Sequence, residues 1–263
     1  MGFTSSIFRL ILGSMLCIVV SAGESNGQFG PDSSSGFRIP LPIGALSGGD
    51  NNKARSLQLE MVVEDNFIGR ELAVENNAFY WVNRGGSKTL RIGKLRGGRL
   101  EIDGHLDKEF NGRMIAVDGG TLYWVDNADQ SIYCADIGDG SLQNKRMIAE
   151  KLDPKLFSVD DGVLYWVQGE NALHAGRVVE GKLQEQGIIH DNFHASMLAA
   201  EKGNIYWVDR NTKALRFGSL KDGKMQVLGV LSANFSGKLL TVDSANFYWL
   251  DQRKEDLCYG RVK

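Results

Sequence analysis

Apolar and polar residues alternate in short runs from about residue 56 to the end of the chain. Alternation with a period of two is typical of half-buried β-strands, and the Gly, Asn and Asp between the runs are typical of tight turns. Proline is scarce, with 4 residues, and glycine is abundant, with 32. The pattern therefore predicts an all-β fold made of many short strands.

One phrase in this pattern recurs five times and contains all five tryptophans of the chain. Each copy reads Tyr-Trp followed by Val or Leu, and the copies begin at Tyr80, Tyr123, Tyr165, Tyr206 and Tyr248. Successive tryptophans are 43, 42, 41 and 42 residues apart. A period near 42 residues, with four strands in each period, predicts the blades of a β-propeller.

The rest of each period is aligned as well. An apolar run that ends in an acid precedes each Tyr-Trp, and a fourth run opens with Arg, Ser or Lys followed by Leu or Met. The third run has a small residue at a fixed place in every copy: Gly93, Ala135, Gly176, Gly218 and Gly260. These positions define four antiparallel strands per blade.

The fifth copy ends after its third strand, at Lys263. The missing fourth-strand pattern occurs at the other end of the repeat region, in residues 56–63. Residues 56–263 therefore predict a five-bladed β-propeller whose last blade is closed by the N-terminal strand. This closure pairs strand edges that would otherwise be open.

The Tyr-Trp-Val-Asp phrase resembles the YWTD repeat, the class B repeat of the low-density-lipoprotein-receptor family, and the resemblance covers most of residues 56–263. Two departures stand out. The family usually has six blades, and its Thr is Val or Leu here, while its final Asp is Asn83 or Gln168 in two copies. The resemblance implies a propeller that binds extracellular proteins, without implying a particular partner.

The N-terminal residues differ from the repeat region. Residues 1–22 combine a short basic start, the apolar run Leu10 to Val20 and the small residues Ser21 and Ala22, which together predict a cleaved signal peptide. Residues 23–55 are rich in Gly, Ser and Asn and predict a flexible leader. No later run is long and apolar enough to span a membrane. We therefore expect a secreted, extracellular protein.

The charge balance excludes some partners. Lys and Arg (30) nearly equal Asp and Glu (32), so the net charge of −2 provides no general attraction to nucleic acid or to an anionic membrane. Hydrophobic residues form 43% and charged residues 24%, as in ordinary globular proteins. Any electrostatic recognition must therefore be local.

Two columns of charged residues flank the first strand of each blade. Acids end that strand, and the column is Glu75, Asp118, Asp160, Glu201 and Asp243. A ring of carboxylates at the channel is a weak candidate for a hard cation such as calcium. We favour a structural interpretation, in which each acid accepts backbone N–H groups in the turn to the second strand. We assign no metal and no cofactor.

A column of mostly basic residues lies five positions before the acids: Arg70, Arg113, Lys155, Ser196 and Lys238. At about 3.3 Å per residue, these side chains should lie at the opposite mouth of the channel. The loops between second and third strands add Arg84, Arg210 and Arg253 at that face. Solvated strand ends are the plain interpretation; the functional one is a binding face for an anionic glycan or protein.

The cysteines and one sequon complete the candidate chemistry. Cys134 and Cys258 are one residue out of phase in the repeat and belong to non-adjacent blades, so we expect no intrachain disulfide. Cys134 should be a buried thiol, whereas Cys258 is a candidate for reactivity or for pairing with another chain. Asn234 begins the only Asn-X-Ser/Thr acceptor sequence considered for glycosylation.

No nucleophile elbow, phosphate loop or paired metal motif is present, so we expect a non-enzymatic protein. The leading hypothesis is a monomeric, secreted binding protein that presents a propeller face to an extracellular protein or anionic glycan. One alternative is a structural component of an extracellular matrix, shell or secreted coat. A third, weaker hypothesis is a metal-assisted hydrolase that uses the acid ring.

Overall fold

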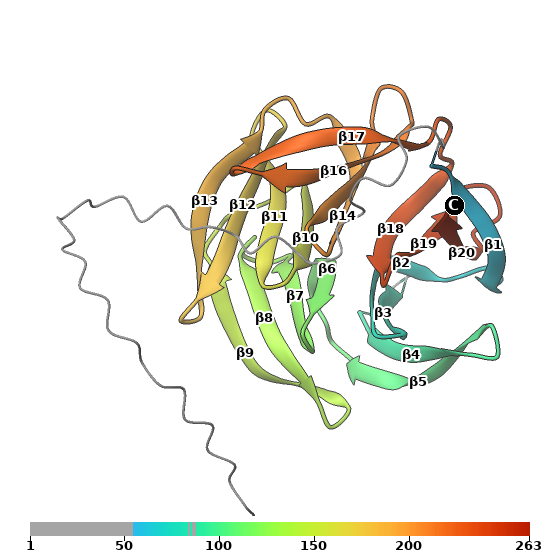
Figure 1. Cartoon of the computed structure of the whole chain (residues 1–263). Helices are drawn as coiled ribbons and strands as arrows, with labels where there is room; N and C mark the ends of the chain where they lie inside the picture. Colours follow the sequence, from blue (N-terminus) through green and yellow to red (C-terminus); the bar gives the residue numbers. More distant parts are fainter. Residues whose placement is uncertain (1–54, 84, 86–87) are drawn as a thin grey trace, which may run out of the picture. The chain divides into compact units, whose positions relative to one another are not determined.

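The computed structural model describes residues 55–83, 85 and 88–263. In these residues every regular element is a β-strand, and the strands form five four-stranded antiparallel sheets. Figure 1 shows the sheets arranged around a common centre. The predicted five-bladed β-propeller is confirmed.

The four strands of a blade follow one another from the channel outward. The inner strands are β2 (Gly69–Glu75), β6 (Gly112–Asp118), β10 (Leu156–Asp160), β14 (Ala195–Glu201) and β18 (Gly237–Asp243). The second strands are β3 (Ala78–Asn83), β7 (Thr121–Asp126), β11 (Val163–Gln168), β15 (Asn204–Asp209) and β19 (Asn246–Asp251). The third strands are β4 (Leu90–Arg96), β8 (Ile132–Gly138), β12 (Ala172–Val179), β16 (Leu215–Lys221) and β20 (Leu257–Val262). The outer strands are β5 (Arg99–Asp107), β9 (Ser141–Ala149), β13 (Lys182–His190), β17 (Lys224–Ser232) and β1 (Leu57–Glu64).

The last blade is closed by the N-terminal strand, as predicted. The strand β1 pairs antiparallel with β20, from Leu57 opposite Val262 to Glu64 opposite Leu257. Beyond this register, the Ser56 and Lys263 backbones exchange two hydrogen bonds, of 3.1 and 3.0 Å. Figure 1 shows the blue β1 beside the dark red β20. The predicted signal peptide and nearly all of the predicted leader lie outside the described residues.

The five tryptophans are core residues at the contacts between blades. Trp81, for example, is 2% exposed and packs with Tyr248 and Leu257 of the preceding blade. In four blades a Phe ring lies 5.4–5.9 Å from the Trp ring of the same blade. The third blade has the partly buried Leu152 at the Phe position. The repeated aromatic residues thus hold the blades together.

The small residue of the third strand is required by a close backbone approach. A Cβ atom on Gly218 would lie 2.5 Å from the carbonyl oxygen of Gln226 on the outer strand. The same contact at Gly176 would be 2.8 Å, to the carbonyl oxygen of Gln184. A register shift brings the outer strand close at this point in both blades. Ala135 occupies the position in the second blade.

Candidate functional site: the central channel

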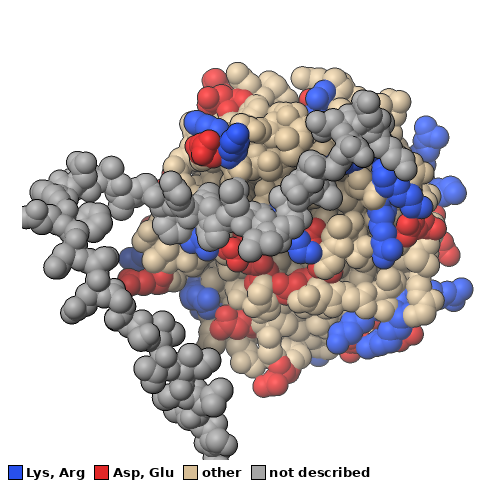
Figure 2. Space-filling model, in the orientation of Figure 1, with Lys and Arg blue, Asp and Glu red and all other residues tan. Residues whose placement is uncertain are grey.

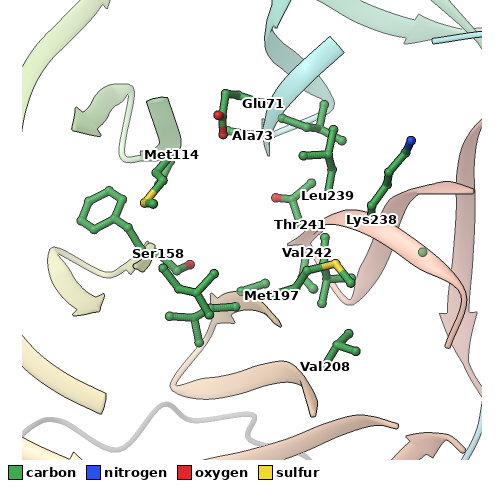
Figure 3. Close-up of a pocket in the computed structure, with 18 of the residues that line it drawn as sticks. Glu71, Ala73, Met114, Ser158, Met197, Val208, Lys238, Leu239, Thr241 and Val242 are labelled. Carbon is green, nitrogen blue, oxygen red and sulfur yellow. The ribbon is translucent and has the colours of Figure 1, made fainter. Parts of the chain in front are cut away.

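The inner strands contact one another in the cyclic order β2, β6, β10, β14, β18 and back to β2. They enclose a cavity of about 470 Å³, which is lined by residues of all five strands. Figure 3 shows this cavity with side chains converging from every blade. Its size is typical of small-molecule sites, and its wall combines apolar side chains with polar groups.

The acid ring at one end of the channel links each blade to the next. Asp160 accepts hydrogen bonds from the backbone amides of Lys202 and Gly203, at 2.8 and 2.6 Å. Asp118 likewise accepts from residues 161 and 162, Glu75 from 119 and 120, Glu201 from 245, and Asp243 from 77. The acids do accept backbone amides, but from the turn of the neighbouring blade and not from the turn that follows them. They lie at the inner end of each blade, where the next hairpin is within reach.

These hydrogen bonds give the recurring acids a structural role. Burial raises the pKa of Asp160, against the opposing effect of the two amides, and the charges of Asp118 and Glu201 raise it further. No group of three or more His, Cys, Asp or Glu side chains that could hold a metal occurs in residues 55–83, 85 and 88–263.

A second set of acids shapes the loops at the opposite end of the blades. Asp209 accepts the amides of Asn211 and Thr212, at 3.0 and 2.8 Å, and the Thr212 amide contributes most to lowering its pKa. Asp251 accepts the amides of Arg253 and Lys254, at 2.9 and 2.8 Å. Loops held by such turns present fixed side chains around the other channel mouth.

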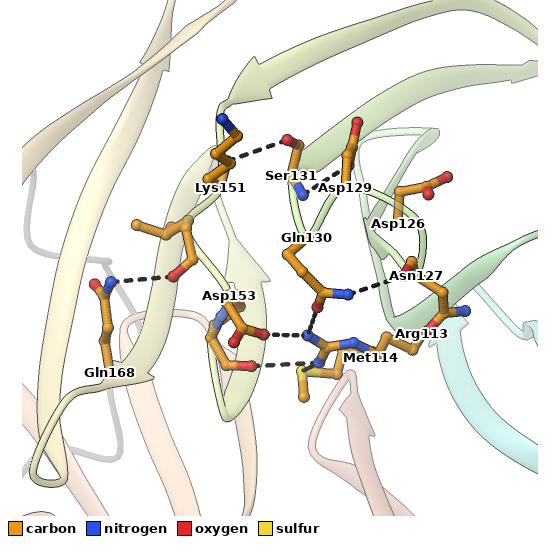
Figure 4. Close-up of polar contacts among 12 residues, drawn as sticks. Arg113, Met114, Asp126, Asn127, Asp129, Gln130, Ser131, Lys151, Asp153 and Gln168 are labelled. Atoms are coloured by element: carbon orange, nitrogen blue, oxygen red, sulfur yellow. Dashed lines mark hydrogen bonds and ion pairs between the residues drawn. The ribbon is translucent and has the colours of Figure 1, made fainter.

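Two of the predicted basic residues at that mouth are held in ion pairs. The Arg113 guanidinium donates to Asp153 at 2.6 Å and to Gln130 at 2.7 Å, as Figure 4 shows. The Lys238 ammonium donates to Glu255 at 2.9 Å. Each ion pair places an acid beside one of the basic groups that the sequence predicts there.

The other basic residues have neutral partners. The Arg70 guanidinium donates to the carbonyl oxygen of Gly112 at 3.4 Å, and the Lys155 ammonium donates to that of Gly169 at 2.6 Å. Arg210 donates to the carbonyl oxygen of Ala195 at 3.1 Å. A carbonyl positions a cation but leaves its charge intact. Arg253 is exposed at the end of a loop, and Arg84 lies outside the described residues.

The residue that directly follows each member of the basic column also faces the channel, and the sequence analysis did not single it out. Four blades have an apolar side chain there and one has an acid, and the column is Glu71, Met114, Leu156, Met197 and Leu239. All five line the cavity. Burial raises the pKa of Glu71 more than the Met114 amide, Arg70 and Arg113 lower it. The aligned repeats already show this difference, since the first blade has an acid at the position where the other four have Met or Leu.

The backbone at this level is irregular. Register shifts mark the start of four inner strands, for example between Lys238 and Leu240 of β18. Met114 and Leu239 have φ angles of 52° and 57°, in the left-handed region that large side chains rarely adopt. These bulges turn extra side chains into the channel mouth.

No family model and no curated protein matches the chain. Among solved structures, glutaminyl cyclase from Myxococcus xanthus superposes with a TM-score of 0.57 and 15% identity, over 80% of this chain and 97% of that one. The nidogen/laminin complex gives 0.47 and 17%, over 75% and 86%. A structural genomics protein of unknown function from Bacteroides thetaiotaomicron gives 0.48 and 14%, over 74% and 59%.

At 15% identity, the likeness to the glutaminyl cyclase shows the fold alone. Membership of the low-density-lipoprotein-receptor class B family is not shown, so the Tyr-Trp-Val-Asp resemblance stays a resemblance in sequence. No membrane-crossing helix occurs in the part of the chain that the structure describes.

The remaining predicted groups lie away from the channel. Cys134 and Cys258 are both buried free thiols, and burial raises the pKa of Cys258 to about 11. A buried, protonated thiol is a poor nucleophile, which weighs against the reactive or interchain role considered for Cys258. Asn234 is exposed in the connection between β17 and β18, while the adjoining Phe235 is buried.

One face of the propeller has mixed charge. On the face shown in Figure 2, basic and acidic side chains are interspersed, with no broad area of one sign. This agrees with the nearly balanced composition. Electrostatic recognition at this face therefore depends on a few positioned groups.

Proposed function

We propose that this protein is a secreted, non-enzymatic binding protein that recognises an anionic glycan or an extracellular protein at one mouth of the propeller channel. The mouth in question is the one formed by the starts of the inner strands and by the loops after the second strands. Secretion is inferred from the signal-peptide pattern of residues 1–22.

One observation carries the proposal. Arg70, Lys155 and Arg210 surround this mouth and are held by backbone carbonyls. None of the three forms an ion pair with an acid among the described residues. Their positive charge is fixed in place and remains available to an anionic partner, which favours both the rate and the specificity of association.

The acid end of the channel differs from the proposed binding mouth, and the difference supports placing recognition at the basic end. The five acids there are engaged with backbone amides of neighbouring blades, which gives them a structural task. Propellers use the loops at one end of the channel as binding surfaces because the blades hold these loops rigidly. The mouth with the carbonyl-held cations is therefore the better candidate for recognition.

The likeness to a glutaminyl cyclase is not a reason to propose that activity here. It concerns the backbone fold at 15% identity. Function depends on the residues of a site, and unrelated functions occur on one fold. The matrix-component alternative has no specific observation in its favour.

The proposal is tested by probing an array of glycans and extracellular proteins with three forms of the secreted chain. The first form is unaltered. The second has Arg70, Lys155 and Arg210 changed to Gln. The third has Arg99, Lys182 and Lys221 changed to Gln; these exposed residues lie near the β4–β5, β12–β13 and β16–β17 hairpins, at the acid end of the sheets. Both variants lose the same number of charges.

We expect acidic glycans or proteins to bind the unaltered chain and the third form, and to bind the second form at least tenfold more weakly. Equal loss in both variants would show that net charge alone is responsible and would contradict the proposed mouth. Absence of binding by the unaltered chain across the array would contradict the binding function itself.

A further inference from the structure

The cavity behind the proposed binding mouth has its own chemistry. The five-fold repeat provides an internal comparison, because each position occurs once in every blade. At the level of Glu71, the other blades place Met114, Leu156, Met197 and Leu239. All four are partly buried and pack on the cores between blades. Packing at this level therefore requires an apolar side chain, and the carboxylate of Glu71 needs another explanation.

Burial dominates the environment of Glu71. It raises the pKa of this acid more than the Met114 backbone amide and the charges of Arg70 and Arg113 lower it, and no described residue forms an ion pair with it. Burying a carboxylate without a paired charge is costly. Such a group persists where a ligand or a reaction uses it.

Two hydroxyl groups lie at the next level of the same cavity. There the blades carry three alanines, Ser158 and Thr241. The Ser158 hydroxyl accepts the Ala200 amide at 3.0 Å, which leaves its own proton free to donate. Figure 3 shows Ser158 and Thr241 on the wall of the cavity. Glu71, Ser158 and Thr241 thus bring polar groups from three blades into a wall that also contains Ser196, Lys213, Lys238 and Gln252.

Strained backbone adjoins the same level. Met114 and Leu239 adopt left-handed conformations with φ of 52° and 57°, and both side chains line the cavity. Such conformations cost free energy and are concentrated at functional sites. At Met114 the bulge also directs a backbone amide toward Glu71.

We propose that the central cavity binds a small organic amine, with the ammonium group on the Glu71 carboxylate and an apolar body against Met114, Met197 and Leu239. The hydroxyls of Ser158 and Thr241 accept or donate hydrogen bonds to polar atoms of the same ligand. The site is separate from the macromolecular face of the proposed function and does not depend on it.

The basic side chains near the cavity are paired with other groups or lie outside its lining. Lys238 lines the cavity, but its ammonium is paired with Glu255, and Figure 3 shows it directed away from the centre. Arg70 and Arg113 are not part of the cavity lining, and they donate to Gly112 and to Asp153. Lys213, at the rim, is exposed. Glu71 is the acidic side chain among the lining residues.

The probe is 2-phenylethylamine, measured by isothermal titration calorimetry against the full chain at neutral pH, beside a panel of smaller and larger aliphatic amines. The neutral control is 2-phenylethanol, and the anionic control is 3-phenylpropanoate. Glu71→Gln keeps the size of the side chain. Glu71→Leu copies the residue that the third and fifth blades have at this level.

We expect at least one amine of the panel to bind the unaltered chain at least tenfold more tightly than 2-phenylethanol. Both variants should lose at least tenfold in amine affinity. Glu71→Leu should also melt about 2–8 °C higher, because an apolar side chain replaces an acid whose charged form is disfavoured by burial. That increase would show that its lost affinity does not come from misfolding.

The proposal is overturned if no amine of the panel binds, if 2-phenylethanol or 3-phenylpropanoate binds as tightly, or if Glu71→Gln and Glu71→Leu keep full affinity. Retained array binding by these two variants would leave the mouth proposal intact in any of these cases. The two proposals therefore fail separately.

Discussion

At the residue scale, the sterically restricted glycines of the third strands are the most direct link between sequence and fold. The small-residue column was readable from the repeat, but its cause was not, because the close approach of the outer strand depends on a register shift that no local pattern signals. The structure supplies the cause at Gly218, where a Cβ atom would lie 2.5 Å from the Gln226 carbonyl oxygen.

Replacing Gly218 by Ala should therefore destabilise the propeller by about 1–3 kcal/mol, the usual cost of overpacking a rigid site. Gly138 is the matched control, since a Cβ atom there would meet only the flexible Gln143 side chain, at 3.4 Å. Gly138→Ala should change stability by less than about 1 kcal/mol. Urea denaturation followed by tryptophan fluorescence measures both, and equal losses would refute the steric explanation.

Glu71 makes a pH-dependent contribution at the same scale. Burial raises its pKa in the folded protein, against the Met114 amide and the charges of Arg70 and Arg113. The folded chain therefore binds this proton more readily than the unfolded chain does, and stability falls as the pH rises from the ordinary glutamate pKa through the raised value.

Glu71→Gln should remove this part of the pH profile. Thermal melts at half-unit steps from pH 4 to pH 7 should show the melting temperature of the unaltered chain falling relative to that of the variant as the pH rises. Parallel profiles would mean that Glu71 is solvated like an ordinary surface acid.

At the scale of elements, the links between acid and turn connect each inner strand to the next hairpin. The sequence indicated backbone-binding acids, but not their partners, because partners such as Asp160 and Gly203 are 43 residues apart in sequence and meet only when neighbouring blades pack. Glu71 was missed for a related reason. Its column becomes informative once the other four members are known to line one cavity.

Removing one acid should weaken one link. Asp160→Ala leaves the amides of Lys202 and Gly203 without their acceptor and should cost about 1–3 kcal/mol. Asp160→Asn keeps one acceptor oxygen and should cost less. Asp191→Ala is the control, because Asp191 is exposed. Chemical denaturation ranks the three variants, and a loss for Asp191→Ala as large as that for Asp160→Ala would contradict the role of the links.

At the scale of the whole propeller, stability depends on closing the ring through β1. Val63 of this strand is 2% exposed and packs with Phe67 and Leu257, whereas its neighbour Val62 is 40% exposed. The closing strand was predicted from its fourth-strand pattern, and the architecture followed from five matched periods. The cavity could not be predicted, because its volume depends on how far the blades stand apart.

Val63→Asp should destabilise the propeller by several kcal/mol, on the order of 3–5, because it buries an unpaired charge in the closing blade. Val62→Asp, one residue away on the opposite face, should cost less than about 1 kcal/mol. Unfolding monitored by tryptophan fluorescence compares them. Similar losses at the two positions would mean that the face of β1 directed to the core does not close the ring as described.

The difference between the two mouths of the channel is the central claim, and heparin-affinity chromatography tests it most directly. The unaltered chain, the Arg70/Lys155/Arg210→Gln form and the Arg99/Lys182/Lys221→Gln form are eluted with the same salt gradient. Since exposed charge–charge attraction is screened by salt, the elution concentration reports how strongly each form holds the polyanion. We expect the first and third forms to be retained and the second to elute at clearly lower salt. Loss of retention in the third form as large as in the second, or no retention of the unaltered chain, would contradict the account.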